Sequence, residues 1–523
     1  MISWALDGES LSIANVVSTA SAWQSPDSMR VELVPKAVDR VRACRDAVER
    51  LLARREIVYG VTTGFGAFKD RFITEDQAAQ LQRNLLMSHA VGVGAPLSQE
   101  TVRAMMLIRA NTLAKGYSGI RLQTLQALLE LLNRGVHPVV PEQGSVGASG
   151  DLAPLAHMAL VLIGMGEAFY QGERMSGSQA LQHSHLEPIG LEAKEGVALT
   201  NGTSLMTAVG CLASHRARTL LETADVAAAL TIEALCGTPA ALDARLHQAR
   251  PHAGQNACAA RLRRLLEGSE LVRGAQSTNV QDAYTLRCVP QVHGAILDVV
   301  DHVQGVLAIE LNSATDNPLI FLDNGEEVAL SGGNFHGEPV ALALDYLGLA
   351  LTDLGNMSER RTARLLDPAT NDGLLPAFLT DHGGLNSGLM LLQYTAAALA
   401  SENKILAHPA SADSIPTSAN MEDHVSMGVT AAHKSARIVE HVEQIVAIEL
   451  LCAAQGIDFR RREQPSLKLG PGTAGAFQAV REHVPFIPVD EVMYPHIKTM
   501  HRLVHEGQIA EAARKGVDAS RHH

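Results

Sequence analysis

Five long stretches of the chain run with few helix breakers until proline or glycine ends each of them. Alanine and leucine are abundant in these stretches and favour helices, whereas runs of β-branched residues with a period of two are scarce. Aromatic residues make up only 4% of the 523 residues. A proline or glycine just beyond a helical pattern is an ordinary stop signal. The sequence therefore predicts a mainly α fold with long helices over residues 204–235, 290–311, 339–366, 389–406 and 422–455.

Composition changes along the chain and suggests three regions. Residues 1–200 are richer in glycine and turn dipeptides, residues 201–460 hold the long helical stretches, and residues 461–523 are more polar and carry several prolines. Several long helices in succession with short connections are typical of a large elongated helical bundle. We expect an N-terminal glycine-rich domain, a central long-helix bundle, and a C-terminal loop with short helices.

The charge balance and the N-terminus exclude several classes of partner. Lys and Arg total 43 against 56 Asp and Glu, a net charge of -13, and nucleic-acid binding usually needs a basic surface. The first residues show neither the basic nor the apolar region of a signal peptide, and no uninterrupted apolar run has the length of a membrane span. We expect a cytoplasmic protein without a nucleic-acid or membrane partner.

Familiar catalytic and binding motifs are absent from the sequence. The 22 histidines include no H-E-x-x-H zinc motif, so we expect no metal site. The glycine cluster at 64–66 has Lys69 where a dinucleotide loop needs its third glycine, and no G-x-x-x-x-G-K-[ST] phosphate loop occurs. A serine-hydrolase elbow needs G-x-S-x-G, but Gly150 follows Ser149 directly.

The tetrapeptide Ala148-Ser149-Gly150-Asp151, set among further glycines, has two interpretations. In the first it is a flexible turn, with Ser149 or Asp151 as N-cap of a following helix. In the second the backbone bends until the amide nitrogen of Gly150 attacks the carbonyl carbon of Ala148, an approach that a residue without a side chain permits. Loss of water then closes a five-membered ring, and dehydration of Ser149 leaves an electrophilic methylidene carbon.

The wider sequence resembles the aromatic amino-acid ammonia-lyases and aminomutases that carry a methylidene-imidazolone (MIO) group, and among them histidine ammonia-lyase. The resemblance covers the order of motifs from about residue 55 to about residue 460. It implies a fumarase/aspartase-like helical bundle whose N-terminal region carries an MIO group formed autocatalytically from Ala148, Ser149 and Gly150. The matching segments are Tyr59-Gly60-Val61-Thr62-Thr63-Gly64-Phe65-Gly66, Gly144 to His157, Leu199-Thr200-Asn201-Gly202-Thr203, Gln281 to Cys288, Asp316-Asn317-Pro318 and Gly332-Gly333-Asn334-Phe335-His336.

The resemblance also implies roles for individual residues in eliminating ammonia from an L-amino acid. Tyr59 is similar to the tyrosine that removes the β-proton, and Arg287 to the residue that binds the substrate carboxylate, a task suited to a bidentate guanidinium. Tyr284 and Asn201 resemble residues that hydrogen-bond the electrophile. Gln281 and Phe335 resemble further pocket residues. Without the resemblance, three of these residues have ordinary structural interpretations. Tyr59 would be a packed aromatic residue, Arg287 a surface ion-pair partner and Asn201 a helix N-cap.

Two positions bear on the identity of the substrate. His89 lies where the family selects the side-chain ring, and it argues against phenylalanine without separating tyrosine from histidine. Glu422, in Thr417-Ser418-Ala419-Asn420-Met421-Glu422-Asp423-His424, resembles the glutamate of histidine ammonia-lyases. A carboxylate can accept the N–H of an imidazole, whereas beside a phenyl ring it would be an unpaired buried charge. The alternative is an exposed glutamate in the first turn of a helix.

We therefore expect conversion of L-histidine to trans-urocanate and ammonia by a homotetramer with active sites shared between chains, and without a metal. The alternatives are a tyrosine or phenylalanine ammonia-lyase and an MIO aminomutase, which uses the same residues. A lyase of the fumarase–aspartase type without MIO would need a mobile serine loop that the sequence lacks. A non-enzymatic helical scaffold would have no near-ultraviolet chromophore.

Overall fold

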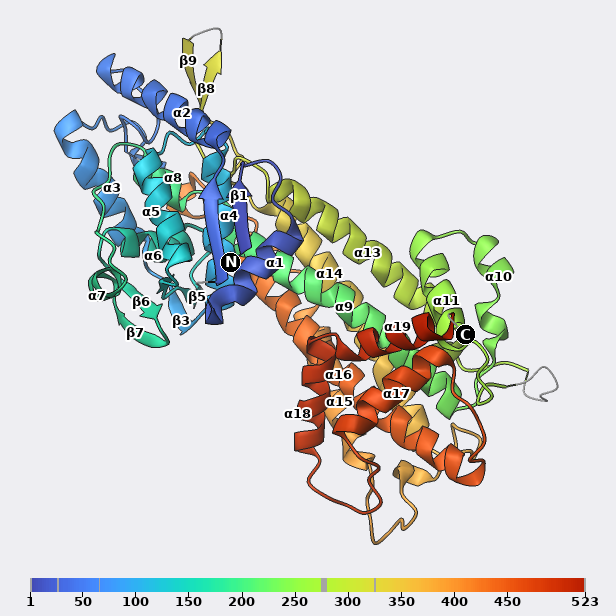
Figure 1. The fold of residues 1–523 in the computed structure, drawn as a ribbon. Helices are drawn as coiled ribbons and strands as arrows, with labels where there is room; N and C mark the ends of the chain where they lie inside the picture. The colour runs from blue at the N-terminus through green and yellow to red at the C-terminus, as the bar shows by residue number, and fades with distance from the viewer. Residues whose placement is uncertain (1, 26–27, 65, 274–279, 324–325, 522–523) are drawn as a thin grey trace. The chain divides into compact units, whose positions relative to one another are not determined.

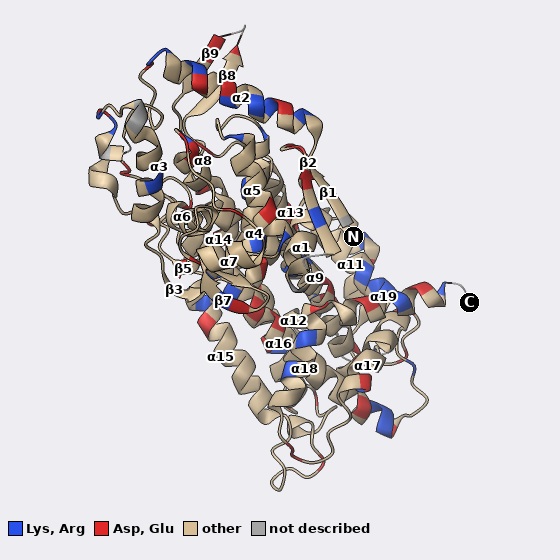
Figure 2. Ribbon diagram, turned by 60° about the vertical axis from the view of Figure 1, so that its left-hand side comes forward, with Lys and Arg blue, Asp and Glu red and all other residues tan. Residues whose placement is uncertain are grey.

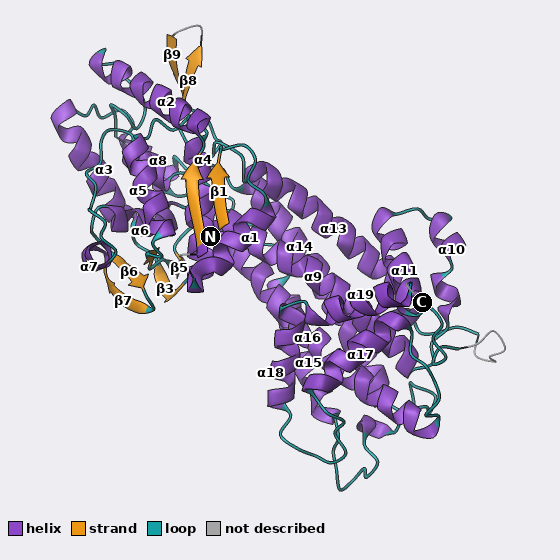
Figure 3. Ribbon diagram, in the orientation of Figure 1, coloured by secondary structure: helices purple, strands orange, loops and turns teal. Residues whose placement is uncertain are grey.

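Long helices dominate the structure, and strands are few and short (Figures 1 and 3). This computed structural model describes residues 2–25, 28–64, 66–273, 280–323 and 326–521. Two compact units are formed, each from three separate parts of the chain. The first unit comprises Met1–His215, Val303–Asp345 and Pro409–His433, and the second comprises Arg216–His302, Tyr346–His408 and Lys434–His523. The mainly α fold predicted from the sequence is confirmed.

The first unit is built around helix α4 (Gln99–Ala114), whose residues from Val102 to Ala114 are all buried. Helices α1, α2 and α5 pack against it. The other elements of this unit position the segments that carry the motifs. Its further helices are α1 (Ile13–Ser21), α2 (Pro35–Ala53), α3 (Glu75–His89), α5 (Leu122–Asn133), α6 (Leu152–Leu162), α7 (Gly177–His183) and α8 (Glu195–Thr200).

The strands described by the structure form four small sheets in this unit. Strands β1 (Ile2–Leu6) and β2 (Met29–Leu33) pair in parallel, with Trp4 opposite Val31. The remaining pairs are antiparallel. They are β3 (Val93–Pro96) with β5 (Pro141–Gln143), β4 (His137–Pro138) with β6 (Glu167–Tyr170), β6 with β7 (Glu173–Ser176), and β8 (Leu319–Asp323) with β9 (Glu326–Leu330).

The second unit contains only helices and connecting segments among its described residues. Helices α17 and α19 pack closely, because Gly475 and Gly516 bring their backbones together: a Cβ at Gly475 would lie 2.5 Å from the carbonyl oxygen of Ala512. The helices that lie wholly in this unit are α10 (Ala244–Gln248), α11 (Ala253–Leu265), α12 (Tyr284–Arg287), α15 (Met390–Leu406), α17 (Pro471–His483), α18 (Tyr494–His505) and α19 (Gln508–Ser520).

Four long helices each belong partly to one unit and partly to the other: α9 (Ser204–Ala234), α13 (Val289–Glu310), α14 (Glu338–Leu366) and α16 (Gly428–Glu463). The sequence predicted the bounds of α9, α13, α14 and α15 to within one residue. The prediction for α16 was wrong at both ends, because the helix begins six residues later and continues through Gly456. A Cβ at Gly456 would lie 3.3 Å from the Cβ of Ala234, so this glycine permits close packing of two helices instead of ending one.

Within the second unit a buried ionic network joins these four helices. The guanidinium of Arg361 binds the carboxylate of Glu449 with contacts of 2.6 and 2.9 Å, and both side chains are fully buried. The hydroxyls of Thr231 and Ser358 donate to the same carboxylate at 2.8 and 2.7 Å. Arg361 also lies 3.4 Å from Nε2 of His293, whose Nδ1 is 2.7 Å from Asp225. Every oxygen of the buried Glu449 carboxylate therefore has a partner.

The charged residues are mixed in sign along the surface helices. Figure 2 shows acidic and basic residues interspersed along α2. Within the described residues, one helix, α13, is long and apolar enough to cross a membrane by length and composition. Core helices of globular proteins meet the same criterion, and α13 carries Asp298 and Asp301, which the interior of a bilayer disfavours.

The expected division near residues 200 and 460 follows composition along the sequence, and it stays a prediction. The compact units of the structure are instead assembled from separate segments. As a result, residues that are distant in the sequence, such as Ser149 and Glu422, belong to the same unit.

A buried histidine beside a buried arginine makes the stability of the first unit sensitive to pH. Nε2 of His137 lies 3.3 Å from the guanidinium of Arg103, and both side chains are almost fully buried. Burial and the neighbouring positive charge lower the pKa of His137 to about 3. Below pH ~6.5 His137 is protonated in the unfolded chain but stays neutral in the folded one. The free energy of unfolding therefore decreases as the pH falls from ~6.5 towards 3.

We expect the midpoint of thermal unfolding to decrease from pH 7 to pH 5, with this group contributing about 2 kcal/mol of the lost stability. The control variant His137→Gln keeps a hydrogen-bond acceptor that does not titrate in this range. Its unfolding midpoint should depend less on pH than that of the wild type, measured by circular dichroism. Equal pH dependence of the two proteins would contradict the assignment.

Candidate active site

The Ala148-Ser149-Gly150 segment is held in a tight turn that requires glycine at both ends. Gly147 and Gly150 have φ angles of +75° and +73° and pair with each other as an antiparallel bridge. A Cβ at Gly150 would lie 2.2 Å from the carbonyl oxygen of Gly202, and one at Gly147 would lie 2.1 Å from Oγ of Ser426. No side chain fits at Gly150, because the backbone of Gly202 is too close, and at Gly147 the positive φ and the Ser426 hydroxyl both disfavour one. Ala148 is buried in the turn, and Ser149 is half-buried.

Asp151 fixes this turn to the N-terminus of α9. Its Oδ2 accepts hydrogen bonds from the backbone N–H groups of Leu205 (2.7 Å) and Met206 (3.1 Å). The backbone adds two bonds, from Asp151 N to the carbonyl of Gly202 at 2.7 Å and from Gly202 N to the carbonyl of Ser149 at 3.2 Å. Burial raises the pKa of Asp151 to about 7, against the lowering effect of the two N–H donors.

Asp151 occupies the N-cap position of α6, as one interpretation of this segment predicted. Asp151 precedes α6, but its side chain makes no capping bond there. It caps a helix that begins about 50 residues later instead, since the first N–H groups of any helix lack intrahelical partners.

Glu422 contacts the turn directly. The Ser149 hydroxyl donates to Oε1 of Glu422 at 3.3 Å, and the Thr417 hydroxyl donates to Oε2 at 3.0 Å. The alternative of a first-turn glutamate is wrong, because α16 begins at Gly428. Glu422 lies in a turn and pairs through its backbone with Thr417.

His89, the last residue of α3, is half-buried near this carboxylate. Its Nδ1 lies 3.0 Å from the Ser88 hydroxyl. Burial lowers the pKa of His89, while the charge of Glu422 acts in the opposite direction. The two residues predicted to contact the substrate ring therefore interact electrostatically in the first unit.

Tyr59 lies in a turn after α2 and is half-buried. The backbone N–H of Gly66 donates to its hydroxyl oxygen at 3.1 Å. Gly66 has φ +54°, and a Cβ there would lie 2.7 Å from Oγ of Ser418. The Tyr59 hydroxyl thus has a backbone donor in a segment that packs closely on the 417–422 turn.

Asn201 and Phe335 belong to segments that hydrogen bonds connect. The buried Asn201 closes α8, so it is not an N-cap, and its side-chain amide donates to the carbonyl of Asn317 at 3.0 Å. The side-chain oxygen of Asn317 accepts from Gly332 N at 2.7 Å, shortly before Phe335. Phe335 is half-buried in the turn that precedes α14.

Gln281, Tyr284 and Arg287 belong to the second unit. Gln281 is exposed, and Tyr284 and Arg287 are the first and last residues of α12. The Arg287 guanidinium lies 4.7 Å from the centroid of the Tyr284 ring, whose residue is 69% exposed. The buried Nε of Arg287 has no hydrogen-bond partner, and no ion pair of Arg287 occurs among the described residues. Tyr284 and Arg287 thus present an exposed phenol and a guanidinium with unused donor capacity.

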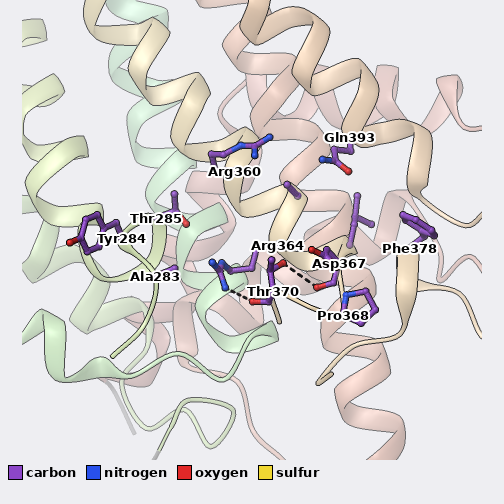
Figure 4. Close-up of a pocket in the computed structure, with 12 residues that line it drawn as sticks. Ala283, Tyr284, Thr285, Arg360, Arg364, Asp367, Pro368, Thr370, Phe378 and Gln393 are labelled. Carbon is purple, nitrogen blue, oxygen red and sulfur yellow. Dashed lines mark hydrogen bonds between the residues drawn. The ribbon is translucent and has the colours of Figure 1, made fainter. Parts of the chain in front are cut away.

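A cavity of about 510 Å³ lies next to α12 within the second unit. Figure 4 shows Tyr284 and Thr285 on one side of it and Arg360, Arg364 and Gln393 on other helices. Its wall carries two arginines and the carboxylate of Asp367, and Arg360 is already paired with Glu359.

Two groups of three metal-ligand side chains occur among the described residues, with donor atoms within 4.8 Å of one another. In the first, Asp225, Cys258 and His293 are buried, but Arg261 binds Asp225 at 2.6 Å and opposes a cation. The second consists of His336, Glu338 and His424. Both ring nitrogens of His336 already lie near hydrogen-bonding backbone groups, at 3.3 and 3.4 Å. None of the residues to which the resemblance assigns a role in the reaction belongs to either group.

Comparison with known proteins identifies the family. The family model for aromatic amino acid lyases matches residues 11–482. The chain belongs to the aromatic amino acid lyases. This membership confirms the family predicted from the motifs and the lyase class of the enzyme.

Individual relatives of this aromatic amino acid lyase are similar over almost their whole length. The histidine ammonia-lyase of Chloroflexus aurantiacus is 58% identical over 516 residues, with 98% of each chain covered. The crystal structure of histidine ammonia-lyase from Trypanosoma cruzi has a TM-score of 0.90 at 43% identity and covers 99% of this chain and 96% of its own. Tyrosine aminomutase from Streptomyces globisporus has a TM-score of 0.92 at 36% identity, with 98% and 99% covered.

The capping role of Asp151 leads to a prediction for this lyase. Asp151→Ala removes the acceptor for two N–H groups at the start of α9 and should lower the free energy of unfolding by roughly 1–3 kcal/mol. Asp151→Asn keeps one acceptor oxygen and should lose less. Chemical denaturation followed by circular dichroism measures both. Unchanged stability of Asp151→Ala would show that the cap contributes little.

Proposed function

We propose that this lyase is a carbon–nitrogen lyase that converts L-histidine to trans-urocanate and ammonia, using an MIO group formed from Ala148, Ser149 and Gly150. The observation that carries the choice of substrate is the carboxylate of Glu422, which contacts Ser149 and interacts with His89. The names of the relatives from Chloroflexus and Trypanosoma support the same substrate.

The residues present fit the prosthetic group. The 147–150 turn is tight, its glycines exclude a Cβ, and Asp151 holds it against α9. Such a turn favours attack of the Gly150 nitrogen on the Ala148 carbonyl carbon, and the ring then forms with loss of two water molecules in total. When formed, the group supplies an electrophilic carbon that captures the substrate amine and makes it a better leaving group.

The remaining chemistry belongs to side chains of the protein. Tyr59 takes the β-proton of the substrate on its phenolate oxygen and becomes neutral, and the N–H of Gly66 hydrogen-bonds that oxygen before the proton arrives. Arg287 binds the substrate carboxylate in bidentate fashion, which its unused donor capacity supports. Tyr284 and Asn201 hydrogen-bond the reacting region, and Gln281 and Phe335 line the pocket. Glu422 and His89 bind the polar ring.

The family resemblance supports a homotetramer in which active sites are shared between chains. The exposed Tyr284 and the unused donor capacity of Arg287 on α12 fit such an arrangement, because both can serve a substrate held elsewhere. We further propose that the enzyme is cytoplasmic, acts on a small molecule without nucleic-acid or membrane partners, and needs no metal.

A second candidate activity is that of an aminomutase, which would return ammonia to the β-carbon. The similarity to tyrosine aminomutase over nearly the whole chain supports this activity as the second candidate. A lyase acting on tyrosine or phenylalanine would give coumarate or cinnamate. Product analysis separates these activities, because an aminomutase yields a β-amino acid.

Intact-mass spectrometry tests the modification. The purified wild type should weigh less than its sequence by the mass of two water molecules, and it should show near-ultraviolet absorbance that the unmodified sequence does not explain. Ser149→Ala cannot lose the serine hydroxyl, so it should lack that second dehydration and the absorbance while keeping its helical content. An active wild type of unmodified mass would overturn the proposal.

A three-way assay of L-histidine, L-tyrosine and L-phenylalanine tests the substrate. Wild type should prefer histidine, and Glu422→Gln should lower kcat/KM for histidine by at least about tenfold, since a charged partner of the imidazole is lost. Any activity on tyrosine should change much less. A tenfold preference of the wild type for tyrosine or phenylalanine would reject histidine as the substrate and leave the lyase reaction intact.

A further inference from the structure

The carboxylate of Glu422 is aimed by an unusual backbone turn. Ser418, Ala419 and Asn420 have φ angles of +52°, +51° and +65°, three consecutive left-handed residues of which none is glycine. This conformation is unfavourable for residues with a Cβ, and it persists where the surrounding structure enforces it. Such an outlier next to the proposed substrate pocket points to a function for the turn.

The two ends of the turn are joined by backbone and side chain. Thr417 N donates to the carbonyl of Glu422 at 2.9 Å, and Glu422 N donates to the carbonyl of Thr417 at 3.3 Å. The Thr417 hydroxyl donates to Oε2 of Glu422 at 3.0 Å, a shorter contact than its 3.5 Å approach to the Glu422 backbone oxygen. Thr417 therefore fixes both the backbone and one carboxylate oxygen of Glu422.

The other carboxylate oxygen has a different partner. Oε1 accepts from the hydroxyl of Ser149 at 3.3 Å. In the proposed maturation this hydroxyl leaves as water, so Oε1 loses its donor while Oε2 keeps the Thr417 hydroxyl. Oε1 is then the oxygen available to the N–H of a substrate ring, and its direction is set by the bond on Oε2.

The same turn also reaches the segment that holds the proposed base. Oγ of Ser418 would be 2.7 Å from a Cβ at Gly66, so the two segments are in close contact. The N–H of Gly66 donates to the hydroxyl oxygen of Tyr59. One rigid turn thus contacts both the ring-binding carboxylate and the support of the proton acceptor.

We propose that Thr417 is a positioning residue that determines substrate specificity: its hydroxyl holds Oε2 of Glu422 so that Oε1 faces the substrate ring. The inference rests on the proposed function, in which Glu422 recognises that ring. Thr417 itself does not touch the substrate, and its effect passes entirely through Glu422.

A double-mutant cycle tests this role in the full-length enzyme. Thr417→Val removes the hydroxyl while keeping the β-branched shape, and it should lower kcat/KM for L-histidine roughly tenfold. Thr417→Ser restores a hydroxyl and should stay within about twofold of wild type. In the Glu422→Gln background, Thr417→Val should change kcat/KM by less than about twofold, because the charged acceptor is already absent.

Controls separate positioning from general damage. Thr362→Val removes another buried hydroxyl, one that donates to the carbonyl of Ser358 within α14 at 3.1 Å, and should leave kcat/KM unchanged. Intact mass shows which variants have lost two water molecules, and kcat/KM is compared only among those matured variants. Should Thr417→Val fold poorly, Thr417→Ala provides the same loss of the hydroxyl without the second methyl group.

Two results would overturn the proposal. One is that Thr417→Val lowers kcat/KM equally in the wild-type and Glu422→Gln backgrounds. The other is that matured Thr417→Val keeps the kcat/KM of the wild type. The failure of the proposed function has a different signature. If the wild type prefers tyrosine or phenylalanine, histidine is rejected as the substrate. The cycle measured with the preferred amino acid then still shows whether Thr417 acts through Glu422.

Discussion

The carboxylate of Asp151, bound to the first N–H groups of α9, is the interaction on which the architecture of the candidate site depends. It joins a glycine-rich turn to the start of a 31-residue helix. Burying a carboxylate is costly unless it is hydrogen-bonded, and here two backbone donors and the positive end of the helix dipole offset part of that cost. These bonds hold the turn against the segment that follows α8, which includes Gly202. Ser149 is thereby placed where its hydroxyl contacts Glu422.

A comparable constraint organises the second unit. Glu449 binds Arg361 and accepts from Thr231 and Ser358, so three long helices meet at one buried carboxylate. Removing one partner of such a pair leaves an uncompensated buried charge and costs on the order of 3–5 kcal/mol. The bonds to Glu449 therefore tie specific turns of these helices together.

The sequence predicted the local features well and the long-range ones poorly. The bounds of α9 and α14 followed from propensity and breakers, which are local properties. The predicted end of α16 at Gly456 was wrong, because whether a glycine ends a helix or admits a neighbouring helix depends on what packs against it. The motifs predicted the segments of the candidate site, and the structure places those of Tyr59, His89, Ser149 and Glu422 in one unit. The capping of α9 by Asp151 and the support of Glu422 by Thr417 were missed, since neither pairing has a local signature. Asparagine at position 420 was the one hint of a left-handed turn, and serine and alanine before it pointed the other way.

The dependence of the 147–150 turn on remote partners has a consequence for how the protein can be monitored. The partners of this turn come from two remote parts of the chain, Gly202 with the adjoining start of α9 and Ser426, and the turn is compressed only when both are in place. A chain that has not folded lacks the compression, and so does a truncated fragment that ends before residue 426. The proposed cyclisation at this turn would therefore occur only in molecules whose first unit has folded. The absorbance of the chromophore would then measure the fraction of chains that have folded, even after those chains are later denatured.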